Sequence, residues 1–115
     1  MGENGAVVIK NLAVSTNGGL ASATVTLESN GEINTDAACG DGPVDALFKA
    51  IDRIVGKSVQ LDDYTIKSVS QGSEALGDAT VKIRYNNRII VGRGISTDIF
   101  EASARAYVNA LSKTN

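Results

Sequence analysis

The sequence contains no histidine and no tryptophan, and it has one cysteine and one proline among its 115 residues. Without an imidazole base, the Ser-His and Cys-His pairs of many hydrolases cannot form, and a zinc site with histidine ligands is excluded. A lone cysteine has no intramolecular disulfide partner, which fits a reducing compartment. Carboxylates, lysine and tyrosine are therefore the residues left for acid-base chemistry.

Charge and hydrophobicity exclude further classes of function. Eleven Lys and Arg against 13 Asp and Glu give a net charge of -2, which offers no general attraction to nucleic acid or to anionic membranes. No apolar run approaches the roughly 20 residues of a membrane span, and the N-terminus lacks a signal-peptide pattern. With 43% apolar residues, we expect one globular domain, located in the cytoplasm, with neither nucleic acid nor a membrane as partner.

An internal repeat is present at an offset of 56 residues, where segments 23–55 and 79–111 share seven identities in 33 ungapped pairs. Alternating apolar and polar residues in both copies are typical of strands with one buried face. Tight hairpin turns are predicted at Asn30-Gly31 and Asn86-Asn87, since these residues tolerate positive φ. Three strands are predicted in each copy, at residues 7–14, 23–28 and 32–38, and at residues 64–69, 79–84 and 88–91.

Each copy then becomes helical, with Gly42 and Asp98 predicted as N-caps and with Asp45 or Glu101 in the first turn. Apolar faces and stripes of alanine suited to close packing recur in both helices: Val44, Leu47, Ile51, Ile54 and Val55 with Ala46 and Ala50, then Ile99, Phe100, Tyr107, Val108 and Leu111 with Ala102, Ala106 and Ala110. The sequence predicts an α+β fold of two pseudo-symmetric βββα units, about residues 6–56 and 63–113, that form one domain. We expect the helices to pack on antiparallel sheets and the units to pack on each other or on a partner copy.

The strongest chemical feature is the turn Gly40-Asp41-Gly42, directly before Pro43. Glycines let a ligand approach the backbone, and the free N–H groups of a helix start favour a carboxylate or a phosphate. A tight strand-to-helix turn also needs glycine, so an anion site and a purely structural turn both stay open. Cys39, just before the turn, is expected to be a small buried residue rather than a reactive thiol.

A second acidic feature, Asp62-Asp63, lacks a third oxygen ligand nearby. Calcium and magnesium sites require several oxygen ligands. We therefore predict a solvated turn at these residues and no metal site in the chain.

Four ordered motifs resemble the C-terminal regulatory domain of 2-isopropylmalate synthase. They are GDGPVDA at 40–46, LDDY at 61–64, GSEALG at 72–77 and GRGISTDI at 92–99, and they are followed by EASARAY at 101–107. The resemblance covers nearly everything from Leu20 to Ser112. The C-terminal domain of the related citramalate synthases is of the same type and resembles this chain as well.

This resemblance implies a regulatory domain that forms a homodimer and binds the end product of its pathway as a feedback inhibitor. The end product is leucine for the isopropylmalate synthases and isoleucine for the citramalate synthases. Catalysis in that family belongs to a TIM barrel that condenses acetyl-CoA with a 2-oxo acid and uses a divalent metal. We therefore expect that this chain is not an enzyme on its own, that it holds no cofactor, and that the catalytic barrel is a further partner.

An α-amino acid presents a carboxylate, an ammonium and an apolar side chain, so its site needs N–H donors, an acceptor and a small apolar pocket. We expect the leucine site to include the turn before the first helix, with two helix residues as its wall, and the resemblance adds residues further along the chain: Gly40, Asp41, Gly42 and Pro43, then Ala46 and Leu47, then Tyr64, Ser68, Ser70, Gly72 and Ala75. No catalytic residue is expected. Two alternatives stay open, namely isoleucine binding and a purely structural dimerisation module without a ligand.

Overall fold

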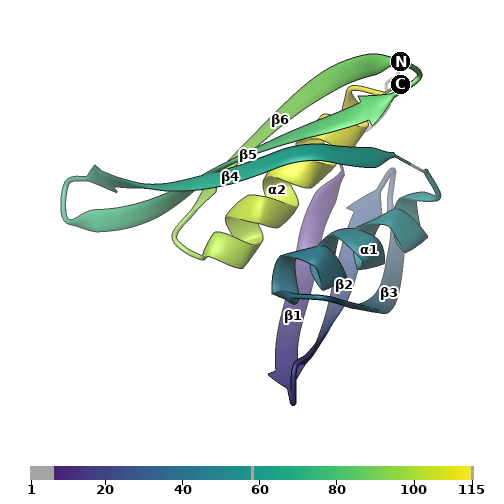
Figure 1. The fold of residues 1–115 in the computed structure, drawn as a ribbon, viewed down its shortest axis with the longest axis horizontal. Coiled ribbons are helices and arrows are strands. Elements are labelled where there is room, and N and C mark those ends of the chain that lie inside the picture. Colours follow the sequence, from purple (N-terminus) through teal and green to yellow (C-terminus); the bar gives the residue numbers. More distant parts are fainter. Residues whose placement is uncertain (1–6, 58, 115) are drawn as a thin grey trace. The chain divides into compact units, whose positions relative to one another are not determined.

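The structure is a computed structural model that describes residues 7–57 and 59–114. The chain divides into two compact units, Met1–Lys57 and Ser58–Asn115, and each has three strands followed by a helix (Figure 1). Unit one contains β1 (Val8–Asn17), β2 (Leu20–Ser29), β3 (Glu32–Gly40) and α1 (Pro43–Val55). Unit two contains β4 (Gln60–Gln71), β5 (Glu74–Tyr85), β6 (Arg88–Ser96) and α2 (Ile99–Ser112). The predicted α+β fold with two βββα units is confirmed, and their union in one domain stays a prediction.

Both sheets are antiparallel, with strand orders β1-β2-β3 and β4-β5-β6. The two predicted hairpin turns are confirmed, since φ is 55° at Asn30, 81° at Gly31, 53° at Asn86 and 62° at Asn87. Positive φ at both central residues matches the right-handed twist of the flanking strands. The strands extend beyond the predicted ranges, because each ladder continues to the two-residue turn that closes its hairpin.

The edge strands β1 and β4 each contain an irregularity at the same place of the repeat. The register of β1 shifts at Lys10, and the register of β4 shifts at Asp62. Lys10 Nζ lies 3.4 Å from a carboxylate oxygen of Glu28, and Asp62 Oδ1 lies 3.3 Å from Nη2 of Arg84. The same ion pair thus recurs with its charges reversed. The predicted solvated turn at Asp62 is wrong, because the β4 ladder continues on both sides of it.

In unit one, α1 covers one face of the sheet and packs mainly on β2 and β3. The side chains buried in this unit alternate along β2 and recur at helical spacing along α1: Ala21, Ala23, Val25 and Leu27, then Ala46, Leu47, Phe48, Ala50 and Ile51. Full burial of each large apolar side chain stabilises the fold by about 1.5–3 kcal/mol. The predicted apolar face of α1 is confirmed at Leu47 and Ile51, whereas Val44, Ile54 and Val55 are only half-buried.

In unit two, α2 rests almost directly on the backbone of β6. A Cβ atom at Gly94 would lie 2.5 Å from the Ala102 carbonyl oxygen and 2.6 Å from the Ala106 nitrogen. A Cβ atom at Gly92 would collide with the backbone of Ala106 and Ala110. All three alanines are fully buried, which confirms that this small-residue stripe serves close packing. Among the described residues, no helix is long and apolar enough to cross a membrane.

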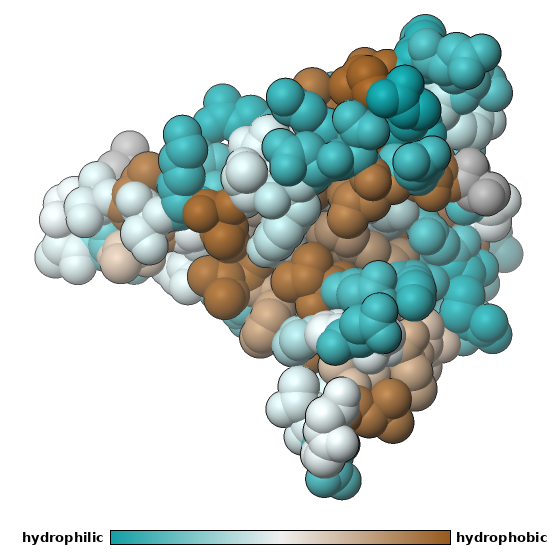
Figure 2. All heavy atoms as spheres, in the orientation of Figure 1, coloured by the Kyte–Doolittle hydropathy of each residue, from teal (hydrophilic) through white to brown (hydrophobic). Residues whose placement is uncertain are grey.

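Two burial predictions were wrong. Cys39 is exposed, because it pairs with Ser22 on the face of the sheet opposite to the face that α1 covers. Ile99 is 51% exposed, because it is the first residue of α2 and lies over Gly77, which has no side chain to enclose it. Other apolar residues also reach the surface (Figure 2), and the large ones in unit two are Leu61, Ile66, Val69, Ile89, Val91, Ile95 and Ile99.

Candidate functional site

The turn before α1 leaves the first N–H groups of the helix without a side-chain cap. Gly42 is the N-cap residue, as predicted, with φ −154° and ψ 175°, and Pro43 follows at the first helical position. The first helical bond runs from the Ala46 N–H to the Gly42 carbonyl at 2.9 Å. Asp41 is exposed, and its carboxylate has no hydrogen bond or ion pair with any other described residue. The turn therefore presents N–H groups beside the exposed Asp41 carboxylate, whose negative charge also acts on the Lys49 ammonium.

Asp45 holds this turn in place. Its Oδ2 accepts a hydrogen bond from the Asp41 N–H at 2.9 Å and lies 3.0 Å from the Lys49 ammonium, one helical turn further on. The Asp41 N–H and then Lys49 lower the pKa of Asp45, because both favour the carboxylate. The hydrogen bond to Asp45 and the charge of its carboxylate raise the pKa of Lys49. Asp45 is thus ionised at neutral pH and ties the turn to the first turn of α1.

The two glycines of the turn differ in what requires them. A Cβ atom at Gly40 would lie 2.5 Å from the Ala46 nitrogen and 2.6 Å from Oδ2 of Asp45, so the close approach of β3 and α1 explains this glycine. A Cβ atom at Gly42 would meet no atom within 4 Å, and the extended backbone there suits any residue. Neither packing nor conformation requires a glycine at position 42. The space in front of it is open.

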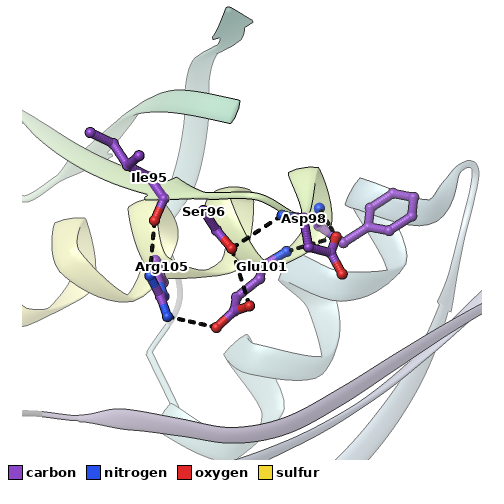
Figure 3. Close-up of polar contacts among 6 residues, drawn as sticks. Ile95, Ser96, Asp98, Glu101 and Arg105 are labelled. Carbon is purple, nitrogen blue, oxygen red and sulfur yellow. Dashed lines mark hydrogen bonds and ion pairs between the residues drawn. The ribbon is translucent and has the colours of Figure 1, made fainter. Parts of the chain in front are cut away.

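The start of α2, in contrast to that of α1, is capped by a side chain. Asp98, predicted as its N-cap, accepts hydrogen bonds from the Phe100 N–H at 2.8 Å and the Glu101 N–H at 3.4 Å. Ser96 Oγ donates to Glu101 Oε1 at 3.2 Å and accepts from the Asp98 N–H at 3.2 Å (Figure 3). Arg105 Nη2 in turn donates to the other Glu101 oxygen at 2.7 Å. These side chains occupy the helix start that Gly42 leaves open in the other unit.

The predicted site residues of unit two lie along the β4–β5 hairpin. Tyr64, Ser68 and Ser70 alternate along β4, so their side chains share the face of the sheet that carries α2. Ala75 is the β5 partner of Ser70 and shares that face. Gly72 forms the hairpin turn with φ 63°, a conformation that explains the glycine without a ligand.

Tyr64 is fixed by a residue that sequence reasoning missed. Its hydroxyl lies 2.7 Å from Oγ of Ser103 on α2, and Ser103 donates its own proton to the Ile99 carbonyl at 2.8 Å. Tyr64 is therefore the donor, since a serine hydroxyl has a single hydrogen. Ser103 is fully buried. The repeat contained the signal, because Ser103 aligns with Leu47, a serine where the other copy has a core leucine.

The structure brings the predicted residues together as two sets, one in each unit. The turn residues of unit one are contiguous, and Ala46 and Leu47 below them are fully buried, so neither exposes surface to a ligand in this conformation. The hairpin residues of unit two form a row on one face, with Ser68 and Ser70 exposed. A single leucine site that uses both sets stays a prediction.

Comparison with known proteins identifies the family. The family described as "LeuA allosteric (dimerisation) domain" matches residues 2–115. The 2-isopropylmalate synthase of Ruminiclostridium cellulolyticum is 50% identical over 95 residues, which are 83% of this chain and 19% of that protein. That of Clostridium kluyveri is 49% identical over 94 residues, 82% of this chain and 18% of the relative. That of a Nostoc species is 50% identical over 92 residues, 79% of this chain and 17% of the relative.

The chain thus spans less than a fifth of the length of these relatives. The match extends over both βββα units, the turn before α1 and the β4–β5 hairpin. It agrees with the motifs on which the resemblance to a regulatory domain depends. The chain belongs to the family of LeuA allosteric (dimerisation) domains.

Proposed function

We propose that this chain is a dimeric regulatory domain that binds leucine and thereby inhibits a 2-isopropylmalate synthase in the cytoplasm. The chain performs no catalysis itself, and the condensation of acetyl-CoA belongs to a catalytic barrel with which the domain communicates. Allosteric inhibition requires that leucine binds two arrangements of the protein with unequal affinity. The family assignment supports this proposal at the level of a regulatory domain.

The observation that carries ligand binding is the open start of α1. Two requirements of an amino acid ligand meet there, because uncapped N–H groups suit its carboxylate and Asp41 suits its ammonium. Gly42 leaves open space where any other residue would place a side chain. The leucine side chain needs a further apolar contact. The resemblance to the family also assigns residues of the unit-two hairpin, Tyr64 among them, to leucine binding.

Calorimetric titration of the chain with leucine, isoleucine and valine tests the proposal. We expect leucine to bind and to raise the melting temperature, since a ligand that binds only the folded state at 100 times its Kd stabilises by about 2.7 kcal/mol. The absence of both binding heat and thermal shift with all three amino acids would refute leucine sensing and favour a purely structural dimerisation module. Isoleucine binding more than about tenfold tighter than leucine would assign the domain to the citramalate synthases, because pockets discriminate such isomers by about 1–3 kcal/mol.

Two substitutions locate the site. Gly42→Ala should keep the melting temperature of the free protein and weaken leucine binding at least about tenfold, because the methyl group enters open space that the ligand needs. Asp41→Asn should weaken binding through the lost contact with the ammonium. Glu32→Ala, at the exposed first residue of β3 in the β2–β3 hairpin, is the matched control. Unchanged affinity in Gly42→Ala and Asp41→Asn would contradict the placement of the site.

A further inference from the structure

The edge of β6 that does not pair with β5 is bonded by side chains of α2. Three polar side chains spaced four residues apart, two on α2 and one on its C-cap residue, bond outward backbone groups of alternate β6 residues: Arg105 to the Ile95 carbonyl at 2.8 Å (Figure 3), Asn109 to the Arg93 N–H at 3.1 Å, and Lys113 to the Val91 carbonyl at 2.7 Å. Four helical residues advance about 6.0 Å and two strand residues about 6.8 Å, so the two spacings match. No further strand can pair with β6 while these bonds persist.

The equivalent edge in unit one is guarded by a different device. The Ala37 N–H, which aligns with the Arg93 N–H in the repeat, donates to Oδ1 of Asp36 at 2.8 Å. Nε of Arg53 on α1 lies 3.2 Å from the same carboxylate oxygen. In both units, then, side chains bond backbone groups on the edge beside the helix, whereas no strand among the described residues pairs with the outer edge of β1 or of β4.

The ladder determines which backbone groups of β4 point outward. The outward groups of Arg93 and Ile95 imply that their β5 partners, Thr80 and Asp78, bond toward β4. The β4 residues that receive those bonds are Thr65 and Lys67. The residue between them, Ile66, consequently directs its N–H and carbonyl away from the sheet. An exposed edge of this kind is a template for another strand.

Charge then selects the partner and the register. Asp63 and Lys67 project from the same outer face of β4, both are exposed, and neither has an ion pair with another described residue. Asp78, which faces Lys67 across the ladder, is already bound by Arg93 at 2.8 Å. An antiparallel copy of β4 centred on Thr65 places each Asp63 opposite the Lys67 of the other copy. Opposite charges at directly paired positions stabilise a sheet, and like charges destabilise it.

We propose that residues 63–67 of β4 pair antiparallel with the same residues of a second copy, about a two-fold axis at Thr65, and join two three-stranded sheets into one. This proposal depends on the dimerisation part of the proposed function and names its surface. The register shift at Asp62 interrupts the regular ladder directly before the first residue of the pairing segment. Charge cannot select a partner or a register for β1 in the same way, because its residues 11–17 contain no charged side chain.

The pairing has a consequence for the candidate site. On the face that carries α2, Tyr64 of one copy comes to lie opposite Ile66 of the other. The partner thus contributes an apolar side chain beside the row that contains Ser68. Ile66 is 37% exposed in the single chain, and pairing covers it. The hairpin part of the site is then complete only in the dimer.

Disulfide trapping tests the register in the full chain. In a Cys39→Ser background, Thr65→Cys places two thiols at a non-hydrogen-bonded pair with Cα atoms about 4.5 Å apart, which suits a disulfide. We expect a covalent dimer under mild oxidation. Ala13→Cys, the matched position on β1, should give none. Cross-linking of Ala13→Cys and not of Thr65→Cys would overturn the proposal in favour of the other edge.

Charge exchange provides a second test that needs no cysteine. Asp63→Lys and Lys67→Asp each place like charges opposite each other, and each should raise the dimer Kd in sedimentation equilibrium about tenfold or more. The double variant Asp63→Lys with Lys67→Asp restores opposite charges and should restore the dimer. A monomeric native chain, or equal dimer Kd values for all variants, refutes the pairing. Leucine titration of the same variants separates this outcome from failure of the sensor proposal, because heat of binding without pairing refutes the pairing alone.

Discussion

The hydroxyl of Tyr64 on β4 donates a hydrogen bond to Ser103 Oγ on α2 across 2.7 Å, although the two residues are 39 positions apart. The Ser103 hydroxyl in turn donates a hydrogen bond to the Ile99 carbonyl within the same helix. A strand that α2 otherwise contacts little is thereby tied to the helix by a part-buried hydrogen bond. The aligned residue in the first unit is the core leucine Leu47. The same helix position is thus buried in both units, by an apolar side chain in the first and by a hydrogen-bonded serine in the second.

Tyr64→Phe removes this contact and keeps the ring. We expect the free energy of unfolding, measured in urea, to fall by about 0.5–1.5 kcal/mol, the usual net value of one hydrogen bond. Ser103→Ala should cost at least as much, and the double variant should cost less than the sum of the two single losses. Strict additivity would show that the two hydroxyls do not interact in solution.

Gly92→Ala should be among the most damaging single-methyl changes in the chain. Its Cβ atom would overlap backbone atoms of Ala106 and Ala110, which cannot move without displacing α2. We expect a loss of about 3 kcal/mol or more in unfolding free energy, at the upper end for an overpacked core. Gly42→Ala, which meets open space, is the control and should stay within about 1 kcal/mol of the native protein. A thermal melt that ranks the two variants equally would contradict the observed packing.

Asp98→Ala removes the only side chain that caps the start of α2 in the described residues. Two N–H groups, those of Phe100 and Glu101, lose their acceptor. The expected cost is about 1 kcal/mol in chemical denaturation. Asp98→Asn keeps an acceptor oxygen and should recover most of the loss. Equal destabilisation by both substitutions would indicate that charge, rather than capping, matters at this position.

The turn before α1 should weaken in acid. The pKa of Asp45 is lower in the folded chain than in the unfolded chain, so its stabilising contribution is present above the unfolded pKa, about 4, and is lost as the pH falls through the folded pKa. Hydrogen exchange of the Asp41 N–H should therefore become relatively faster below about pH 4, after correction for intrinsic exchange rates. Asp45→Asn should remove this acid dependence. An Asp41 N–H with the same protection at pH 3 and pH 6 would show that the carboxylate does not hold the turn.

Features that depend on neighbouring residues were predictable from the sequence. The strand alternation, the turns at Asn30-Gly31 and Asn86-Asn87, and the N-caps Gly42 and Asp98 all appear in the structure. Each depends on backbone conformation or on contacts within a few residues, where residue type is decisive. The exposed Cys39 was mispredicted, because a pattern of small residues does not show which face of a sheet a helix covers.

The candidate site was predictable in its parts and not in its geometry. Motifs pointed to the turn that contains Gly40 and Gly42, yet only coordinates separate the two glycines, since one is required by the approach of α1 and the other is not. Ser103 escaped notice because a serine within an alanine-rich helix gives no local sign of the strand residue that it meets. Such pairings depend on distances across the fold.

By itself, the sequence determined the repeat, the βββα order and the family, because periodicity, turn chemistry and ordered motifs are written in consecutive residues. The tertiary structure decided which edges are closed. The bonds from Arg105, Asn109 and Lys113 to β6 join residues 10 to 22 positions apart, and they form only because α2 lies flat on glycines of that strand. Where a helix comes to rest depends on volume and shape in three dimensions, and this position decides which strand remains available to a partner.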